Sequence, residues 1–198
     1  MCARIAPDDQ RKRHSPDSLL RIAVEVFTLR GYDGTSMEHI AAASGITKSS
    51  IYHHVRGKEE LLRLALRRAL DGLSAVLDEP EARSGKAVDR LECVIRRSVE
   101  VLAAERPYVT LLLRVRGNTP TEVWALEQRR AFDRAVAGLV ERAVADGDLR
   151  AGLDPRLATR LVFGLVNSLT EWWQPDRGDP ERMADAVVAL VFGGLLRR

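Results

Sequence analysis

The sequence lacks the features that mark several classes of protein. Only two of its 198 residues are cysteines, and Cys2 and Cys93 provide neither a disulfide framework nor the spacing of metal ligands. No run approaches the roughly 20 apolar residues that a membrane-spanning helix needs, and residues 1–14 lack the apolar segment of a signal peptide. We therefore expect a cytoplasmic protein with no membrane partner, metal or cofactor.

A strand-like alternation of apolar and polar residues is also missing. Apolar residues recur instead at three- and four-residue steps from Leu19 onward, which predicts an all-α fold. Several helix starts are marked by a capping residue followed by proline, whose fixed φ suits the first helical position: Ser15-Pro16, Thr119-Pro120, Asp154-Pro155 and Asp179-Pro180. We expect about nine helices, bounded to within about 2–4 residues, at 16–30, 36–43, 47–54, 58–78, 84–105, 107–115, 120–146, 155–174 and 180–196.

Two helix starts match the capping box, in which a cap hydroxyl and a carboxylate three residues later satisfy each other's backbone amides. They pair Thr35 with Glu38 and Thr119 with Glu122. The formal net charge of +3 permits contact with a polyanion without requiring it. The basic run at 11–14 is interpreted as a solvated arm rather than one that tracks DNA.

The segment 37–54 has the pattern of a helix-turn-helix. Two helices that cross over a short turn need a small residue where they approach, a glycine in the turn and apolar residues on the facing sides. These residues are Ala41, Gly45, Ile40, Ile46 and Ile51. An apolar stripe in the preceding helix provides the floor beneath them: Leu19, Ile22, Ala23, Val26 and Phe27.

Residues 15–65 resemble the head of the tetracycline-repressor (TetR) family. The matching positions are Phe27, Gly31-Tyr32, Thr35-Ser36, Ile40-Ala41, Gly45-Ile46, Tyr52-His53-His54-Val55 and Lys58-Glu59. The chain departs from the family pattern at His54, which replaces an aromatic residue, at Val55, which replaces Phe, and at Ser49, which replaces a common Gly. The resemblance implies a dimeric transcription repressor that a small molecule releases from DNA.

The residues expected at DNA form two groups. Thr35, Ser36 and Lys58 lie at helix starts, where free amides and the helix dipole favour a phosphate. The resemblance implies a second group on the reading helix: Thr47, Lys48, Ser49, Ser50, Tyr52, His53 and His54. Two alternatives remain open, because Thr47 could only cap its helix and His54 could pack against the first helix.

The rest of the chain is expected to form a second domain. The predicted organisation is a basic arm at 1–14, a DNA-binding domain at 15–57 and a ligand-binding and dimerisation domain at 58–198. The last two helices are apolar on more faces than a half-exposed helix needs, which favours a two-fold four-helix interface over plain core packing. The candidate interface residues are Leu161, Leu165, Leu169, Ala186, Leu190, Gly193 and Gly194.

The effector is less well defined by the sequence. Candidate pocket residues are Tyr108, Arg114, Trp124, Phe163, Asn167 and Trp172, although aromatic residues at helical spacing also fit a plain core. The run 167–175 resembles the C-terminal part of TetR-family repressors that respond to acyl-CoA thioesters. That resemblance implies an acyl-CoA effector, whose phosphates need cations: Arg97, Arg114, Arg116, Arg129 and Arg130 are the candidates.

Two other functions stay open at this point. A small-molecule carrier or an enzyme with a relic head would bind ligand without DNA, whereas an activator could bind DNA without any ligand. Catalysis is the weaker alternative, because His53 and His54 point about 100° apart on a helix. The sequence also contains no HExxH motif, phosphate loop or nucleophile elbow.

Overall fold

The computed structural model describes residues 15–174 and 178–195, and this part of the chain forms ten α-helices. They are α1 (Pro16–Arg30), α2 (Met37–Ser44), α3 (Lys48–Tyr52), α4 (Lys58–Asp78), α5 (Pro80–Arg83), α6 (Ala87–Ala104), α7 (Arg106–Arg114), α8 (Pro120–Ala145), α9 (Pro155–Trp172) and α10 (Pro180–Leu195). The all-α fold with a helix-turn-helix head is confirmed. The predicted arm at 1–14 lies outside the described residues.

Every expected helix is present, and one short helix was missed. α5 begins at Pro80, whose fixed φ suits that position, but its four residues are too few to show a helical period. α3 ends at Tyr52 instead of residue 54, because the amide of His53 bonds the carbonyl of Ser50 in a tightened last turn.

The proline-marked starts are capped as expected. The Ser15 hydroxyl accepts a hydrogen bond from the Ser18 amide at 3.2 Å. At the start of α9, Asp154 accepts from the amides of Arg156 and Leu157 at 2.9 and 3.1 Å. Each cap satisfies a backbone donor that a helix start otherwise leaves without a partner.

Both predicted capping boxes need correction. Ser36, not Thr35, caps α2: its hydroxyl accepts from the His39 amide, while Nδ1 of His39 accepts from the Ser36 amide. At α8 the Thr119 hydroxyl caps the Glu122 amide at 3.2 Å, but the carboxylate does not return to residue 119. It accepts from the amides of residues 116, 117 and 118 instead, because this loop presents three amides together.

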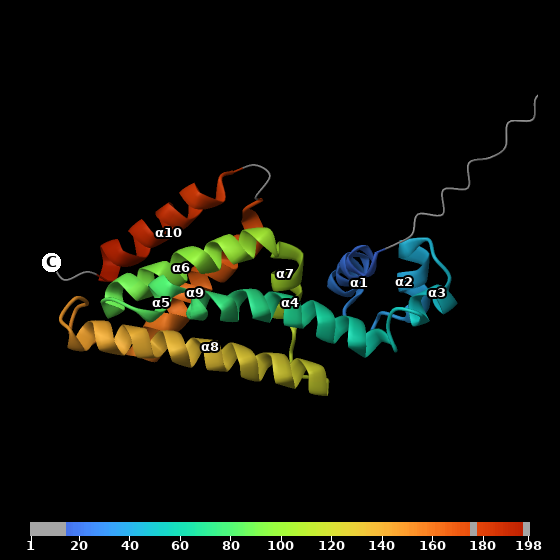
Figure 1. The fold of residues 1–198 in the computed structure, drawn as a ribbon, viewed down its shortest axis with the longest axis horizontal. Coiled ribbons are helices and arrows are strands. Elements are labelled where there is room, and N and C mark those ends of the chain that lie inside the picture. Colours follow the sequence, from blue (N-terminus) through green and yellow to red (C-terminus); the bar gives the residue numbers. More distant parts are fainter. Residues whose placement is uncertain (1–14, 175–177, 196–198) are drawn as a thin grey trace, which may run out of the picture.

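The helices form an elongated molecule with α1, α2 and α3 at one end (Figure 1). α4 leaves this head and enters the body, where it packs against α6, α7 and α8. α8 and α9 pack against each other, and α10 covers α6. The buried apolar core is continuous from Phe27 and Ile51 in the head, through Leu66 of α4, to Ile95 and Leu112 in the body. Within the described residues, no helix has the length and apolar composition to span a bilayer.

Hydrogen bonds also join the head to the body. Nη1 of Arg114, the last residue of α7, donates to the carbonyl oxygen of Thr28 in α1 at 2.8 Å. The Thr121 hydroxyl of α8 donates to Oε1 of Glu59 in α4 at 2.9 Å. A displacement of α7 or α8 in the body therefore acts directly on the helices that support the head.

Candidate DNA-binding head and ligand pocket

The head is a three-helix unit in which α1 and α2 support α3. Ile40 of α2 and Ile51 of α3 are fully buried, and they pack in one cluster with Phe27 of α1. Gly45 adopts a φ of 68° in the turn between α2 and α3, a left-handed conformation that disfavours other residues. α2 and α3 are therefore separate helices, and their buried faces pack in the core of the head.

The outer face of α3 is exposed and polar. Thr47 caps the helix, with its hydroxyl accepting from the Ser50 amide at 3.2 Å and lying 2.9 Å from the Ser50 hydroxyl. Tyr52 keeps 47% of its surface exposed although it belongs to a short, well-packed helix. The other exposed residues of this face are Lys48, Ser49, His53 and His54. His54 faces solvent, so its alternative placement against α1 is not what the structure shows.

The fold places an acid beside the lysine of α3. Nζ of Lys48 is hydrogen-bonded to the carboxylate of Glu38 on α2. This hydrogen bond lowers the pKa of Glu38 to about 2 and raises the pKa of Lys48. The free head therefore holds Lys48 as a paired cation.

Two residues that were expected to contact DNA phosphates are hydrogen-bonded within the head instead. Thr35 is 2% exposed, and its hydroxyl donates to the Gly31 carbonyl at 2.7 Å. Nζ of Lys58 donates to the carbonyl oxygens of Tyr32 and Thr35, both at 2.9 Å, and lies 4.2 Å from the centre of the Tyr32 ring. These contacts brace the loop between α1 and α2, so the position of Thr35 does not support a DNA contact, and Lys58 acts first as a brace. Ser36 is half-buried as the α2 cap.

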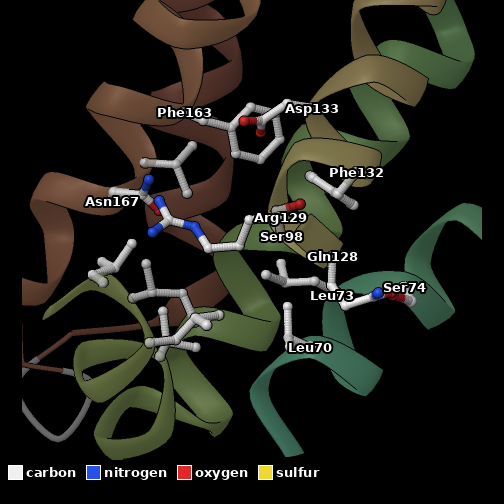
Figure 2. Close-up of a pocket in the computed structure, with 15 residues that line it drawn as sticks. Leu70, Leu73, Ser74, Ser98, Gln128, Arg129, Phe132, Asp133, Phe163 and Asn167 are labelled. Atoms are coloured by element: carbon white, nitrogen blue, oxygen red, sulfur yellow. The ribbon is translucent and has the colours of Figure 1, made fainter. Parts of the chain in front are cut away.

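A small pocket opens between α4, α6, α7, α8 and α9 in the body. It encloses about 40 Å³ and is mostly apolar, with Leu102, Leu112 and Phe163 in its walls. Figure 2 shows the Arg129 side chain crossing it toward Asn167. Desolvation lowers the pKa of Arg129, against the opposing attraction of Asp133. The pocket thus combines apolar walls with a partly buried cation that has no ion pair within the described residues.

Comparison with known proteins gives this arrangement its family. Residues 19–65 match the family described as "Bacterial regulatory proteins, tetR family", and residues 84–195 match "Tetracyclin repressor-like, C-terminal domain". The chain belongs to the TetR family of transcriptional regulators.

Three relatives show how far the likeness extends. A solved TetR-family regulator from Streptomyces coelicolor A3 is 62% identical, with a TM-score of 0.86, over 93% of this chain and 94% of that one. The HTH-type transcriptional repressor KstR2 of Rhodococcus jostii is 28% identical over 96% of this chain and 95% of its own. AibR, solved with isovaleryl coenzyme A and operator DNA, is 25% identical, with a TM-score of 0.75, over 89% and 97%.

Only some of the expected pocket residues of this TetR-family protein line the pocket. Phe163 and Asn167 do. Tyr108 is buried beneath Arg68, Trp124 lies beneath Arg63, and Arg114 contacts α1. Trp172 is 61% exposed, whereas the neighbouring Trp173 is buried. Aromatic content alone does not tell which face of a helix meets a cavity. Arg129, expected as a cation for the effector, does line the pocket, and Phe132 could have been found from its three-residue spacing to Arg129 along α8.

The expected dimer residues lie on α9 and α10 of this TetR-family protein. Leu161 and Leu190 are 67% and 65% exposed, and Leu157 beside them is 54% exposed. Ala186 and Gly193 are also exposed, and Leu165 is half-buried. Leu169 is instead part of the core of its own subunit, with 1% exposure. The surroundings of Gly194 lie outside the described residues.

Proposed function

We propose that the protein is a repressor that binds a near-palindromic operator as a homodimer and is released by a small effector, an acyl-CoA thioester. The exposed face of α3 carries the proposal. Tyr52 is a large side chain half in solvent, on a five-residue helix whose Ile51 is fully buried. A short helix held this rigidly can present donors to base edges and phosphates in the major groove.

Dimerisation supplies the site length that one short helix lacks. Two copies of α3 would read half-sites in successive major grooves, about 34 Å or a multiple of it apart. The exposed leucines of α9 and α10 support an isologous interface, because the same patch on two subunits would cover both. Leu157, Leu161 and Leu190 would then lose contact with water.

The pocket supports release by a ligand. With about 40 Å³ enclosed, it is far smaller than the roughly 300–1,000 Å³ of ordinary small-molecule pockets. A larger acyl group enters only if the surrounding helices move, and α7 and α8 are hydrogen-bonded to α1 and α4. Such a ligand favours a second arrangement of the heads, which is release by differential affinity. The name of KstR2 as a repressor supports repression, and the structure of AibR with isovaleryl coenzyme A supports a coenzyme A thioester as the effector.

This function places the protein in the cytoplasm, where it reaches the chromosome. The test is fluorescence anisotropy with a palindromic duplex taken from the DNA beside its own gene. We expect Tyr52→Ala to weaken operator binding at least about tenfold, within the 1–3 kcal/mol that a good base contact provides. Trp172→Ala is the matched control, because it removes an exposed aromatic side chain of α9, outside the head.

Leu161→Glu tests the homodimer in the same assay. It should give a folded monomer by sedimentation and lose operator binding, since a carboxylate would be buried in the interface. Leu29→Glu, at a position 83% exposed on α1, should leave self-association intact. Undiminished operator binding by Tyr52→Ala would refute the assignment of α3. Operator binding that no ligand reverses would favour the activator.

A further inference from the structure

A second hollow lies beside the pocket, on the outer side of α8 and α9. It measures about 340 Å³ and is lined by Arg130, Arg134, Arg156 and Arg160, together with Asp133, Ala137 and Thr159. Asp133 also lines the inner pocket. The two spaces therefore share a wall residue, and we call the outer one the arginine hollow.

The arginine hollow carries more positive charge than its surroundings neutralise. Within residues 15–174 and 178–195, none of its four guanidinium groups forms an ion pair, whereas Arg68, Arg96 and Arg97 each do. Asp133 is the acid among the lining residues. Desolvation raises the pKa of its carboxyl, while the charges of Arg129, Arg160 and Arg134 pull the other way. Four cations against one carboxylate favour a bound ligand that carries several negative charges.

The helical spacing joins the hollow to the pocket along one face of α9. Arg156, Arg160, Phe163 and Asn167 follow each other at steps of four, three and four residues, so they share a face. Eleven residues of helix span about 16 Å. One end of this path is basic and open, and the other is apolar and enclosed.

The operator is the wrong occupant for the hollow. The helices that line it, α8 and α9, belong to the body, while α3 lies at the far end of the molecule (Figure 1). An elongated ligand with a charged head and an apolar tail fits both ends. Inside the pocket, Arg129 and Asn167 can donate hydrogen bonds to a carbonyl group of the ligand.

We propose that the arginine hollow binds the phosphates of a coenzyme A thioester whose acyl group enters the inner pocket. This assignment rests on the proposed function, because it describes how the same effector is held. It adds Arg134, Arg156 and Arg160 to the ligand site. Asp133 competes with the phosphates for these arginines and weakens the binding of the head.

The test compares two thioesters of one acyl group by calorimetry, on the full chain. Octanoyl-CoA carries the phosphates, and S-octanoyl-N-acetylcysteamine lacks them. We expect octanoyl-CoA to bind at least about tenfold tighter, and Arg134→Ser/Arg160→Ser to remove most of that advantage, since hydrogen bonds to charged groups are the stronger ones. Binding of the phosphate-free thioester should stay the same within about twofold.

Two further variants test the role of Asp133 and control for the loss of an arginine. Asp133→Asn should tighten octanoyl-CoA binding, because it removes the competing carboxylate. Arg182→Ser is the matched control, since it removes an exposed arginine of α10 that does not line the hollow. Equal affinity for the two thioesters, or an unchanged double variant, would overturn the proposal, as would no binding of either thioester. Operator binding by the same variants, measured separately, shows whether the proposed repressor function stands or falls with it.

Discussion

The ammonium group of Lys48 on α3 is hydrogen-bonded to the carboxylate of Glu38 on α2. The pair crosses the turn of the helix-turn-helix, and both side chains remain largely exposed, at 46% and 62%. A lysine that would meet a phosphate is therefore already ion-paired in the free protein. Any DNA contact by Lys48 has to compete with Glu38.

Glu38→Gln should consequently strengthen binding to non-specific DNA. The freed Lys48 can neutralise one more phosphate, so we expect about three- to tenfold tighter binding at low salt and a log–log salt slope steeper by up to about one. Titration of a random-sequence duplex at several salt concentrations measures both quantities. Glu25→Gln, on exposed Glu25 of α1, removes the same charge away from α3 and should change neither the slope nor the affinity. An unchanged slope for Glu38→Gln would show that Lys48 does not reach phosphate.

The same pair makes a pH-dependent contribution to stability. The pKa of Glu38 falls from 4.5 to about 2 on folding, so the folded state binds its proton less tightly than the unfolded state. The stabilisation is then complete above about pH 4.5 and is lost as the pH falls toward 2. Urea unfolding between pH 5 and 2 should show a smaller loss of stability for Glu38→Gln than for the parent. Equal losses in the two proteins would contradict the prediction.

Lys58 is predicted to stabilise the head even without DNA. Its ammonium group bonds the carbonyls of Tyr32 and Thr35, and hydrogen bonds to charged groups contribute about 1.5–3 kcal/mol each. Because Lys58 is half-buried, Lys58→Met should lower the free energy of unfolding by about 1–3 kcal/mol. Urea unfolding of the free protein measures it, with Arg56→Met as the neighbouring exposed control. A residue that served only as a phosphate contact would leave this stability unchanged.

The head could be predicted because local rules determine most of it. A proline after a capping residue starts α1, and Gly45 permits the left-handed turn before α3. The contacts that were missed join residues far apart in the sequence. Lys58 lies 26 residues from Tyr32, and Glu38 lies ten from Lys48. Helical periodicity shows which face is apolar, but not which charged groups from different helices meet.

The ligand site was harder to predict for the same reason. Five helices line the pocket, and the sequence does not reveal their order in space. All the candidates were chosen for their residue type. Phe163 and Asn167 line the pocket because they share the face of α9 that meets it, whereas Trp172 is exposed and Tyr108 is covered by Arg68. The arginines of α8 and α9 form a cluster only when the two helices pack side by side.

α7 connects the pocket to the head through consecutive residues. Val109, Leu112 and Leu113 line the pocket, and Arg114 bonds the carbonyl of Thr28 in α1. α7 packs against both α1 and α4. A ligand that displaces the leucines therefore moves the end of α7 that touches the head.

Arg114→Met should separate ligand binding from DNA release. The substitution keeps much of the apolar stem but removes the donor to Thr28, so the effector should bind with the same affinity within about twofold. Release of the operator should then need about five- to tenfold more effector, because a lost coupling of 1–1.4 kcal/mol corresponds to that factor. Calorimetry measures the first quantity, and anisotropy of the preformed operator complex measures the second. Arg116→Met, an exposed arginine two residues further on, is the matched control. If Arg114→Met released DNA at the parent's effector concentration, the signal would have to pass through the Thr121–Glu59 hydrogen bond between α8 and α4 instead.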